Sequence, residues 1–131
     1  RFVFVEGEGR RVGDLMIPES VWKAMKAGIQ VKITRSLDNR AKEAVVEYDV
    51  EKNVEEIKKV TASLWKVISK KNKEEVIKLL DEKKYNGAVK ILLEFYYDPL
   101  YENTLKKIKF DHEVCNDDLE EAVEKLKFKF L

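Results

Sequence analysis

The fold class is indicated first by a stretch near the start of the chain, Phe2-Val3-Phe4-Val5-Glu6-Gly7-Glu8-Gly9-Arg10-Arg11-Val12-Gly13. Its apolar part, Phe2 to Val5, consists of β-branched and aromatic residues and predicts a buried strand that ends at Glu6. A charged, glycine-rich loop follows and continues to Asp14. The stretch therefore predicts one strand of an α/β sheet with a polar loop at its end.

The segments beyond this loop alternate between helix and strand signals. Proline suits the first turn of a helix and glycine suits its end, so a helix is expected between Pro18 and Gly28. Ile29 to Thr34 then predicts a second strand. A second helix is expected after it, because Ser36 or Asp38 can cap its first turn.

The chain is predicted to be helical from about Asp49 to Tyr97. Apolar residues recur there mostly at three- and four-residue steps, beginning with Val54, Ile57, Val60, Leu64, Trp65 and Ile68. Asn86-Gly87 is expected to break this helical run, and Asp98-Pro99 is expected to end it. Lys106 to Phe110 then predicts a strand, and Asp117 is expected to cap a last helix.

The length of 131 residues fits a single domain. We expect a sheet and site part over residues 1–50, a helical part over 51–98, and a returning strand and helix over 99–131. This order fits an α/β layer structure with a helical insertion, helix-rich overall. The chain starts without Met and inside an expected strand, so it is expected to be a portion of a longer protein.

Composition excludes several classes of function. Lys and Arg number 26 against 25 Asp and Glu, so the net charge of +1 does not predict a partner held by bulk positive charge. One cysteine and one histidine exclude a disulfide framework, a Cys-rich zinc cluster and a multi-His metal site, so no metal ligands are assigned. No apolar run approaches the ~20 residues of a membrane span, and no signal peptide is visible. No membrane partner is expected.

The glycines of the first loop do not form a standard nucleotide motif. Gly7, Gly9 and Gly13 resemble the G-x-G-x-x-G turn of dinucleotide-binding proteins, but one extra residue precedes the last glycine. That turn must also open directly into a helix, whereas the first helix is expected only at Pro18. No G-x-x-x-x-G-K-[ST] motif occurs, so the chain cannot by itself supply a phosphate-binding P-loop.

Charged side chains around this loop are the candidate site. A carboxylate at a strand tip, such as Glu6, is how P-loop proteins hold magnesium or an attacking water. Arg10 and Arg11 could clamp a phosphate with their planar guanidinium groups, or they could form a solvated loop. Arg40, near the start of a helix, could reach the same cleft or lie on the surface. All five arginines fall within the first 40 residues, which favours anion binding near that end.

An aromatic cluster, Tyr96-Tyr97-Asp98-Pro99-Leu100-Tyr101, lies where the helical run is expected to end. Tyrosine rings can stack on bases, so Tyr97 and Tyr101 are candidate RNA-binding residues, with core packing as the alternative. His112 and Cys115 are three residues apart, but no acid–histidine–nucleophile set can be assembled from them. Both are expected to be structural.

Taken together, these stretches resemble the tRNA 2-selenouridine synthase (tRNA 2-thiouridine selenotransferase) family, in its P-loop domain downstream of the Walker A loop. The resemblance is carried by Phe4 to Gly13 with Ile17-Pro18, by Asp38-Asn39-Arg40 with Glu47-Tyr48, and by Tyr96 to Tyr101. Gly9 departs from the family's segment, where serine is expected. The resemblance implies a partial P-loop NTPase-like parallel sheet with a helical insertion.

Members of this family pair a rhodanese-like domain, which bears the reactive cysteine, with a P-loop domain. Together the two domains replace sulfur by selenium at the wobble 2-thiouridine of tRNA, using selenophosphate and passing through a geranylated intermediate. The resemblance implies that this chain helps bind a diphosphate or phosphate substrate and tRNA in the cytoplasm. Its implied partners are a rhodanese-like domain or subunit and an upstream segment that bears the Walker A loop.

The resemblance also implies roles for individual residues. Glu6 and Glu8 match the family's acidic pair and are expected to be catalytic. Arg10, Arg11 and Arg40 match its basic positions and are expected to bind phosphate. The cofactor that fits such a set is magnesium bound together with a diphosphate or nucleotide.

Two other functions stay open at this point. One is a non-catalytic tRNA-binding module, in which the helical part docks RNA through lysines and tyrosines. The other is a nucleotide-kinase-like P-loop fragment, with the three central helices as a lid-like insertion. Under each of these functions the chain alone is expected to be inactive, because it lacks both a phosphate loop and a rhodanese active-site cysteine.

Overall fold

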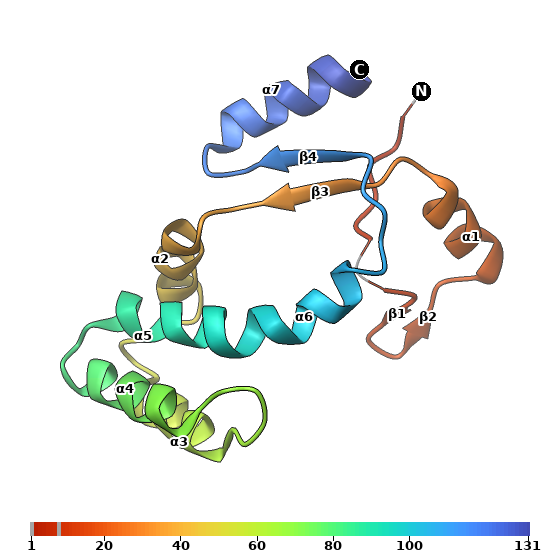
Figure 1. Ribbon diagram of the computed structural model, residues 1–131. Coiled ribbons are helices and arrows are strands. Elements are labelled where there is room, and N and C mark those ends of the chain that lie inside the picture. Colours follow the sequence, from red (N-terminus) through yellow and green to blue (C-terminus); the bar gives the residue numbers. More distant parts are fainter. Residues whose placement is uncertain (1, 8) are drawn as a thin grey trace. The chain divides into compact units, whose positions relative to one another are not determined.

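The computed structural model describes residues 2–7 and 9–131 and shows an α/β chain rich in helix (Figure 1). In chain order its elements are β1 (Arg11–Val12), β2 (Leu15–Met16), α1 (Glu19–Ala27), β3 (Val31–Thr34), α2 (Leu37–Glu47), α3 (Val54–Ser63), α4 (Lys70–Asp81), α5 (Tyr85–Leu92), the π-helical η1 (Leu93–Tyr97), α6 (Asp98–Leu105), β4 (His112–Cys115) and α7 (Leu119–Phe130). These elements form two compact units. The first comprises residues 1–34 and 109–131, and the second comprises residues 35–108.

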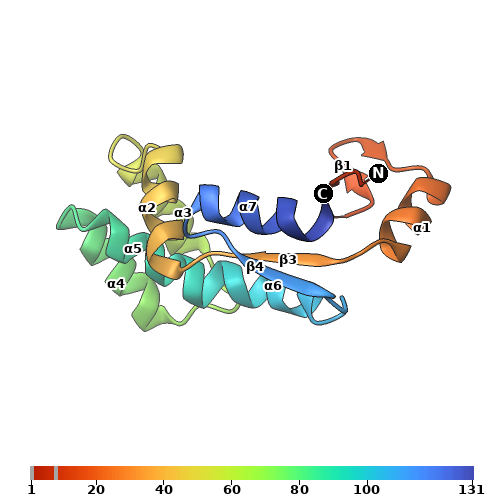
Figure 2. The ribbon, with the colours of Figure 1, turned by 90° about the horizontal axis from the view of Figure 1, so that it is seen from above.

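The first unit is built on a pair of parallel strands. β3 and β4 pair in parallel, with Val31 opposite His112. Beyond the last pair, the Asn116 N–H donates to the carbonyl of Thr34 at 2.7 Å and lengthens the ladder. Figure 2 shows α7 lying along these strands, which it contacts through β4. The predicted parallel sheet in a helix-rich α/β fold is therefore confirmed.

The segment Phe2 to Val5 does not form the buried strand that its composition predicts. Its four side chains are exposed, because β3 and β4 pair with each other and no strand in the described part of the chain pairs with this segment. The alternate residues Phe2 and Phe4 instead place their rings edge-on against Phe130, at centroid distances of 5.9 and 6.0 Å. The segment is therefore held by aromatic contacts to α7 and not by a backbone ladder.

The glycine-rich loop after Glu6 contains a short hairpin that the sequence did not predict. β1 pairs with β2 in an antiparallel manner, with Val12 opposite Leu15. Gly13 occupies the first position of the two-residue turn with a φ of +58°, which glycine adopts without a Cβ clash. Strands of two residues carry too little periodicity to be recognised in a sequence.

α1 follows this hairpin much as predicted. It is preceded by Pro18 and ends at Gly28, whose N–H donates to the carbonyls of Ala24 and Met25. At the next helix, Ser36 is the residue that caps α2, and its hydroxyl accepts a hydrogen bond from the Asn39 N–H at 3.3 Å. These two predicted helices are confirmed.

The second unit contains the better-buried core. In this unit α5 packs against α2 and α4, and α3 packs against α4. Six buried apolar residues form the centre: Ala41, Val50, Val76, Leu80, Ala88 and Val89. They come from α2, α4, α5 and the turn after α2, so burial at this centre joins the three helices.

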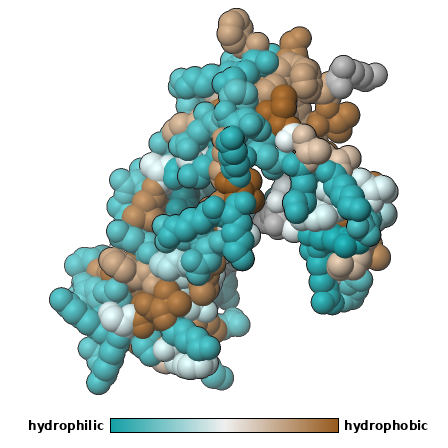
Figure 3. All heavy atoms as spheres, turned by 45° about the vertical axis from the view of Figure 1, so that its right-hand side comes forward, coloured by the Kyte–Doolittle hydropathy of each residue, from teal (hydrophilic) through white to brown (hydrophobic). Residues whose placement is uncertain are grey.

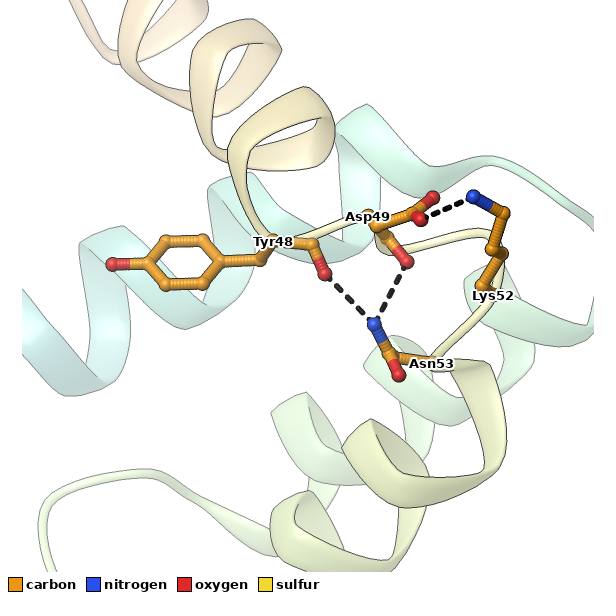
Figure 4. Close-up of polar contacts among 4 residues, drawn as sticks. All are labelled: Tyr48, Asp49, Lys52 and Asn53. Carbon is orange, nitrogen blue, oxygen red and sulfur yellow. Dashed lines mark hydrogen bonds and ion pairs between the residues drawn. The ribbon is translucent and has the colours of Figure 1, made fainter.

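Polar contacts hold the turn between α2 and α3 (Figure 4). The Asn53 side-chain amide donates to the carbonyls of Tyr48 at 3.0 Å and Asp49 at 3.1 Å. The Lys52 ammonium donates to the Asp49 carboxylate at 2.6 Å. The Tyr48 ring points away from the turn. Val50, which belongs to the turn, is buried. Helix α3 therefore begins at Val54, five residues after the predicted start of the helical region.

Two expectations within the helical region are wrong. The apolar spacing carries the first helix through Ile68, but α3 ends at Ser63 and leaves Trp65 exposed. Asn86-Gly87 does not break a helix, because it lies inside α5, close to the buried Ala88 and Val89. Burial of that apolar face outweighs the low helix propensity of the pair.

Asp98-Pro99 does not end the helix either. The chain passes from α5 through η1 directly into α6, where Pro99 occupies the first turn. The Asp98 N–H donates to the Leu93 carbonyl, a bond that spans five residues. This wider turn lets the backbone continue past a residue that has no N–H to donate.

The last strand and helix are shifted from their predicted positions. Lys106 to Phe110 is not a strand, because α6 continues to Leu105 and the pairing with β3 falls on β4 instead. Asp118, and not Asp117, accepts the capping hydrogen bond of α7, from the Glu121 N–H at 2.9 Å. α7 then runs to Phe130.

We predict that Leu80→Ala lowers the free energy of unfolding by about 2–5 kcal/mol, because it removes buried methyl groups from a site that is 1% exposed. Val46→Ala is the matched control, since Val46 is 79% exposed on α2 of the same unit. We expect the control to change stability by less than ~0.5 kcal/mol. Urea unfolding followed by circular dichroism measures both, and equal effects of the two variants would contradict this core.

Candidate functional site

The predicted acidic residues precede the hairpin of the first unit. Glu6 is exposed, and Glu8 lies outside the described residues. A Cβ added at Gly7 or Gly9 would meet nothing within 4 Å, so neither glycine is required by packing. Open space beside these two backbone positions leaves room for a ligand, and a serine at position 9 would also fit.

Arg10 is held by the hairpin that follows it. Its backbone carbonyl accepts a hydrogen bond from the Ile17 N–H at 2.8 Å, and its Nε–H donates to the Ile17 carbonyl at 3.0 Å. The side chain is half-buried. Among the described residues, these contacts use only one of five guanidinium N–H groups, so the four donors on the two terminal nitrogens of Arg10 can bind an anion.

Arg11 is more exposed and more loosely held. Its Nε–H donates to the Gly13 carbonyl at 3.0 Å, within the same turn. Its terminal nitrogen Nη2 lies 4.0 Å from a carboxylate oxygen of Asp14, and both side chains are largely exposed. An ion pair of this kind contributes little to stability, so Arg11 is able to turn toward another anion.

Arg40 lies on α2, in the second unit, and its guanidinium forms a fork-to-fork pair with Asp98. Nη1 donates to Oδ2 at 3.0 Å and Nη2 donates to Oδ1 at 2.5 Å. The hydrogen bonds that Arg40 donates to Asp98 raise the pKa of Arg40 above its usual value, so the guanidinium stays charged. A phosphate would have to displace this carboxylate, and phosphate binding by Arg40 therefore remains a prediction.

A second charged residue of the same segment, Asp38, pairs with Lys90 and joins the start of α2 to α5. The hydrogen bond and charge of Lys90 lower the pKa of Asp38 below 3.8. Arg35 also forms an ion pair, with Glu43 of α2. Two charged residues of the segment Asp38-Asn39-Arg40 thus have partners within the helical unit.

The predicted RNA-binding tyrosines lie four residues apart on η1 and α6. Tyr97 and Tyr101 are both exposed, and the Tyr97 ring meets the Tyr96 ring edge-on at a centroid distance of 5.1 Å. Exposed rings on one helical face are able to stack on bases. Their role remains a prediction.

His112 and Cys115 both lie on β4. The His112 ring packs against Phe130 at a centroid distance of 5.5 Å, and Cys115 is an exposed free thiol. Three positions apart on a strand, they point to opposite faces. Within residues 2–7 and 9–131, no group of three or more His, Cys, Asp or Glu side chains is placed to hold a metal ion.

The predicted site residues are divided between the two units. Glu6, Arg10 and Arg11 lie in the first unit, around one hairpin, whereas Arg40 lies in the second unit. The partner that sequence reasoning missed is Asp98, which is 58 residues from Arg40. No sequence signal marks such a pair, although both residues stand in segments already singled out.

A helix-rich α/β fold with parallel strands is the class to which AAA-type, P-loop-like domains belong. The family model of the tRNA 2-selenouridine synthase AAA domain matches residues 1–78, which is more than half of the chain. The chain therefore belongs to this family, whose role is in tRNA selenation. The matched part contains the predicted acidic and basic positions but not the two tyrosines. No curated protein and no solved structure matches the chain.

Among the helices that the structure describes, none is long and apolar enough to cross a membrane.

We predict that Arg40 and Asp98 are energetically coupled. A double-mutant cycle with Arg40→Ala and Asp98→Ala should give a coupling free energy of roughly 1–2 kcal/mol, between the values for exposed ion pairs and for buried charged hydrogen bonds. The exposed pair Lys52–Asp49 is the control and should give less than ~1 kcal/mol. Unfolding in urea measures all variants, and zero coupling between Arg40 and Asp98 would contradict the fork geometry.

We predict that the pKa of Asp38, measured by carboxyl NMR, lies below 3.8 and returns to about that value in Lys90→Met. A lowered carboxyl pKa adds stability above its unfolded value and loses it as the pH falls through the folded value. The contribution of this pair should therefore be complete well above pH 3.8, begin to decline near that pH, and be lost only once the pH falls below the lowered pKa of the folded protein. Lys42→Met should move the pKa less, because Lys42 acts only through its charge. Unchanged titration of Asp38 in Lys90→Met would refute this pairing.

Proposed function

We propose that this chain is the phosphate- and tRNA-binding portion of an enzyme that replaces sulfur by selenium at the wobble 2-thiouridine of tRNA, through a geranylated intermediate. The observation that carries the proposal is the family match over residues 1–78, which includes the whole Glu6 to Arg11 segment. Since tRNA modification of this kind concerns cytoplasmic tRNA, we place the enzyme in the cytoplasm.

The geometry of Arg10 supports a role in binding the diphosphate or phosphate group. The Ile17 carbonyl fixes the Nε side of the guanidinium, so the terminal nitrogens have a defined direction before any ligand arrives. Preorganised donors of this kind bind phosphate oxygens and neutralise charge that builds up as a bond to the leaving phosphate breaks. Arg11 would add a second, more adaptable positive charge.

Glu6 and Glu8 are the proposed catalytic carboxylates. Magnesium is bound in most phosphate sites through one or two carboxylates together with substrate phosphates, so an exposed Glu6 that precedes an arginine pair by a few residues in the chain suits such an ion. When bound, magnesium would neutralise phosphate charge. Glu6 would hold the ion or orient a water, while the two arginines hold the phosphate oxygens.

The proposed partners are a rhodanese-like domain or subunit and an upstream segment with a Walker A loop. Exposed apolar side chains on the first unit support this proposal, because contact with a partner would remove them from water. They include Val3, Val5, Leu15, Met16, Ile33, Leu119 and Phe128. Figure 3 shows such apolar side chains at the surface among hydrophilic ones. Within the described residues the parallel sheet has two strands, so its outer edges are unpaired and could receive strands of a partner.

A second candidate function is a non-catalytic tRNA-binding module. The exposed rings of Tyr97 and Tyr101, beside a π-helical segment, favour it, because such segments often mark functional positions. Under this alternative, the chain alone should bind tRNA with an affinity that falls steeply with salt, and Arg10 should be dispensable for selenium transfer.

We predict that, in the complete enzyme, Arg10→Ala weakens pyrophosphate binding by about 10- to 100-fold, as expected for the loss of charged hydrogen bonds. Calorimetry measures the binding, and selenium incorporation into 2-thiouridine tRNA should fall in parallel. Arg10→Lys should recover only part of the loss, because an ammonium cannot reproduce the planar fork.

The control for this experiment is Lys23→Ala, which removes an exposed positive charge from the same unit. We expect binding and transfer by this variant to equal those of the wild type. If Arg10→Ala and Arg40→Ala both leave pyrophosphate binding and selenium transfer unchanged, the phosphate-binding role is wrong.

A further inference from the structure

The loop between α3 and α4 exposes a tryptophan. Trp65 is 79% exposed, although its place in the apolar spacing predicts a buried side chain. The loop runs from Leu64 to Ser69, which caps α4 by accepting a hydrogen bond from the Asn72 N–H at 3.1 Å. A large aromatic surface left in water has an unfavourable hydration free energy, so its position calls for a physical explanation.

The backbone of this loop is strained but firmly held. The Ile68 N–H donates to the Lys66 carbonyl at 2.9 Å and closes a three-residue turn centred on Val67, whose φ is +74°. A positive φ is costly for a β-branched residue, and a γ-turn of this form is rare. Contacts on both sides maintain it. The Lys73 ammonium donates to the Leu64 carbonyl at 2.6 Å, and Ile68 is buried.

Because of these contacts, the indole is presented by a fixed backbone. Strained backbone of this kind persists only where the surrounding structure enforces it, and it occurs frequently at sites of binding or catalysis. A preorganised aromatic side chain loses little conformational entropy when a ligand stacks on it.

The loop lies in a positively charged stretch of the sequence. Residues 57–73 contain six lysines and no acidic residue, in a chain whose net charge is only +1. The Lys66 ammonium lies over the Trp65 ring, 4.3 Å from its centroid. Lys70 and Lys71, in the first turn of α4, are exposed, and Lys70 pairs only distantly with Glu74, at 3.8 Å. An aromatic plane flanked by lysines attracts a polyanion that also offers flat rings.

We propose that the Trp65 loop, residues 64–69, stacks on an unpaired base of RNA while Lys66, Lys70 and Lys71 contact the adjacent phosphates. This inference rests on the proposed action on tRNA and adds a contact surface outside the Glu6 to Arg11 segment. Base–aromatic stacking combined with lysines that follow the backbone is the general mode of single-strand recognition. Lys66 beside the ring adds a positive charge where the base and its phosphate meet.

The test uses Trp65 as its own reporter. The chain has two tryptophans, so Trp22→Phe leaves a single indole at position 65. Adding an anticodon stem-loop RNA to the full chain should quench the Trp65 emission, and a blunt RNA duplex of equal length should quench it much less. Trp65→Ala should weaken stem-loop binding by about 5- to 150-fold, and Trp65→Phe should weaken it less because it keeps a ring.

Lysine variants test the phosphate contacts separately. Lys70→Ala/Lys71→Ala should reduce the slope of log affinity against log salt by about 1.4–1.8, as expected for two phosphate contacts. Tyr48→Ala is the matched control, since Tyr48 is an exposed aromatic residue of the same unit that lies between Glu47 and Asp49. We expect this control to bind the stem-loop like the wild type.

Each remaining outcome would overturn the proposal in a distinct way. Stem-loop binding that leaves Trp65 emission unchanged and is insensitive to Trp65→Ala would refute the loop while leaving the action on tRNA intact. A response of Trp65 to anionic phosphatidylserine vesicles but not to RNA would assign the loop to membranes. If neither the full chain nor the complete enzyme binds tRNA, the proposed function fails together with this inference.

Discussion

The parallel pairing of β3 with β4 is the constraint on which the first unit depends, because it joins two segments that stand far apart in the chain, with Val31 opposite His112. Closing so long a connection as a flexible loop would cost conformational entropy. The intervening residues 35–108 form a compact unit with its own buried centre around Val76 and Leu80. The connection is therefore a folded body, and the strands pair without ordering a long disordered loop.

Local signals predicted the elements that depend on local chemistry. Gly28 and Ser36 mark real helix ends because each satisfies backbone groups within a few residues of itself. Signals that depend on distant packing failed. Asn86-Gly87 is helical because its neighbours are buried, and Phe2 to Val5 is not a strand because no partner strand in the described part of the chain accepts it. Apolar spacing could not show that α3 ends before Trp65, since the strained turn at Val67 is enforced by contacts on either side of the loop.

For the candidate site, too, only the features that depend on neighbouring residues could be predicted from the sequence. The neighbouring residues Glu6, Arg10 and Arg11 could be grouped from the sequence, because residues within a few positions of one another are kept near each other by chain connectivity alone. The hydrogen bond that orients Arg10 could not be foreseen, since it depends on the hairpin bringing Ile17 back to it. Arg40 is paired with Asp98, which is 58 residues away. The sequence shows that Arg40 is positively charged, but it does not show that a carboxylate already binds it.

The π-helical segment η1 sets the rotational phase of everything that follows it in the helical run. Each residue of an α-helix turns the chain by about 100°, and the i→i−5 bond from Asp98 to Leu93 fits one extra residue into a single turn, so a regular α-helix with the same number of residues would rotate α6 by roughly that angle about its axis. Asp98 would then face a different direction, and the Arg40 fork would lose its acceptor. The widened turn thus absorbs one extra residue without rotating α6, and the direction of Asp98 depends on the π-helical bonding of this segment.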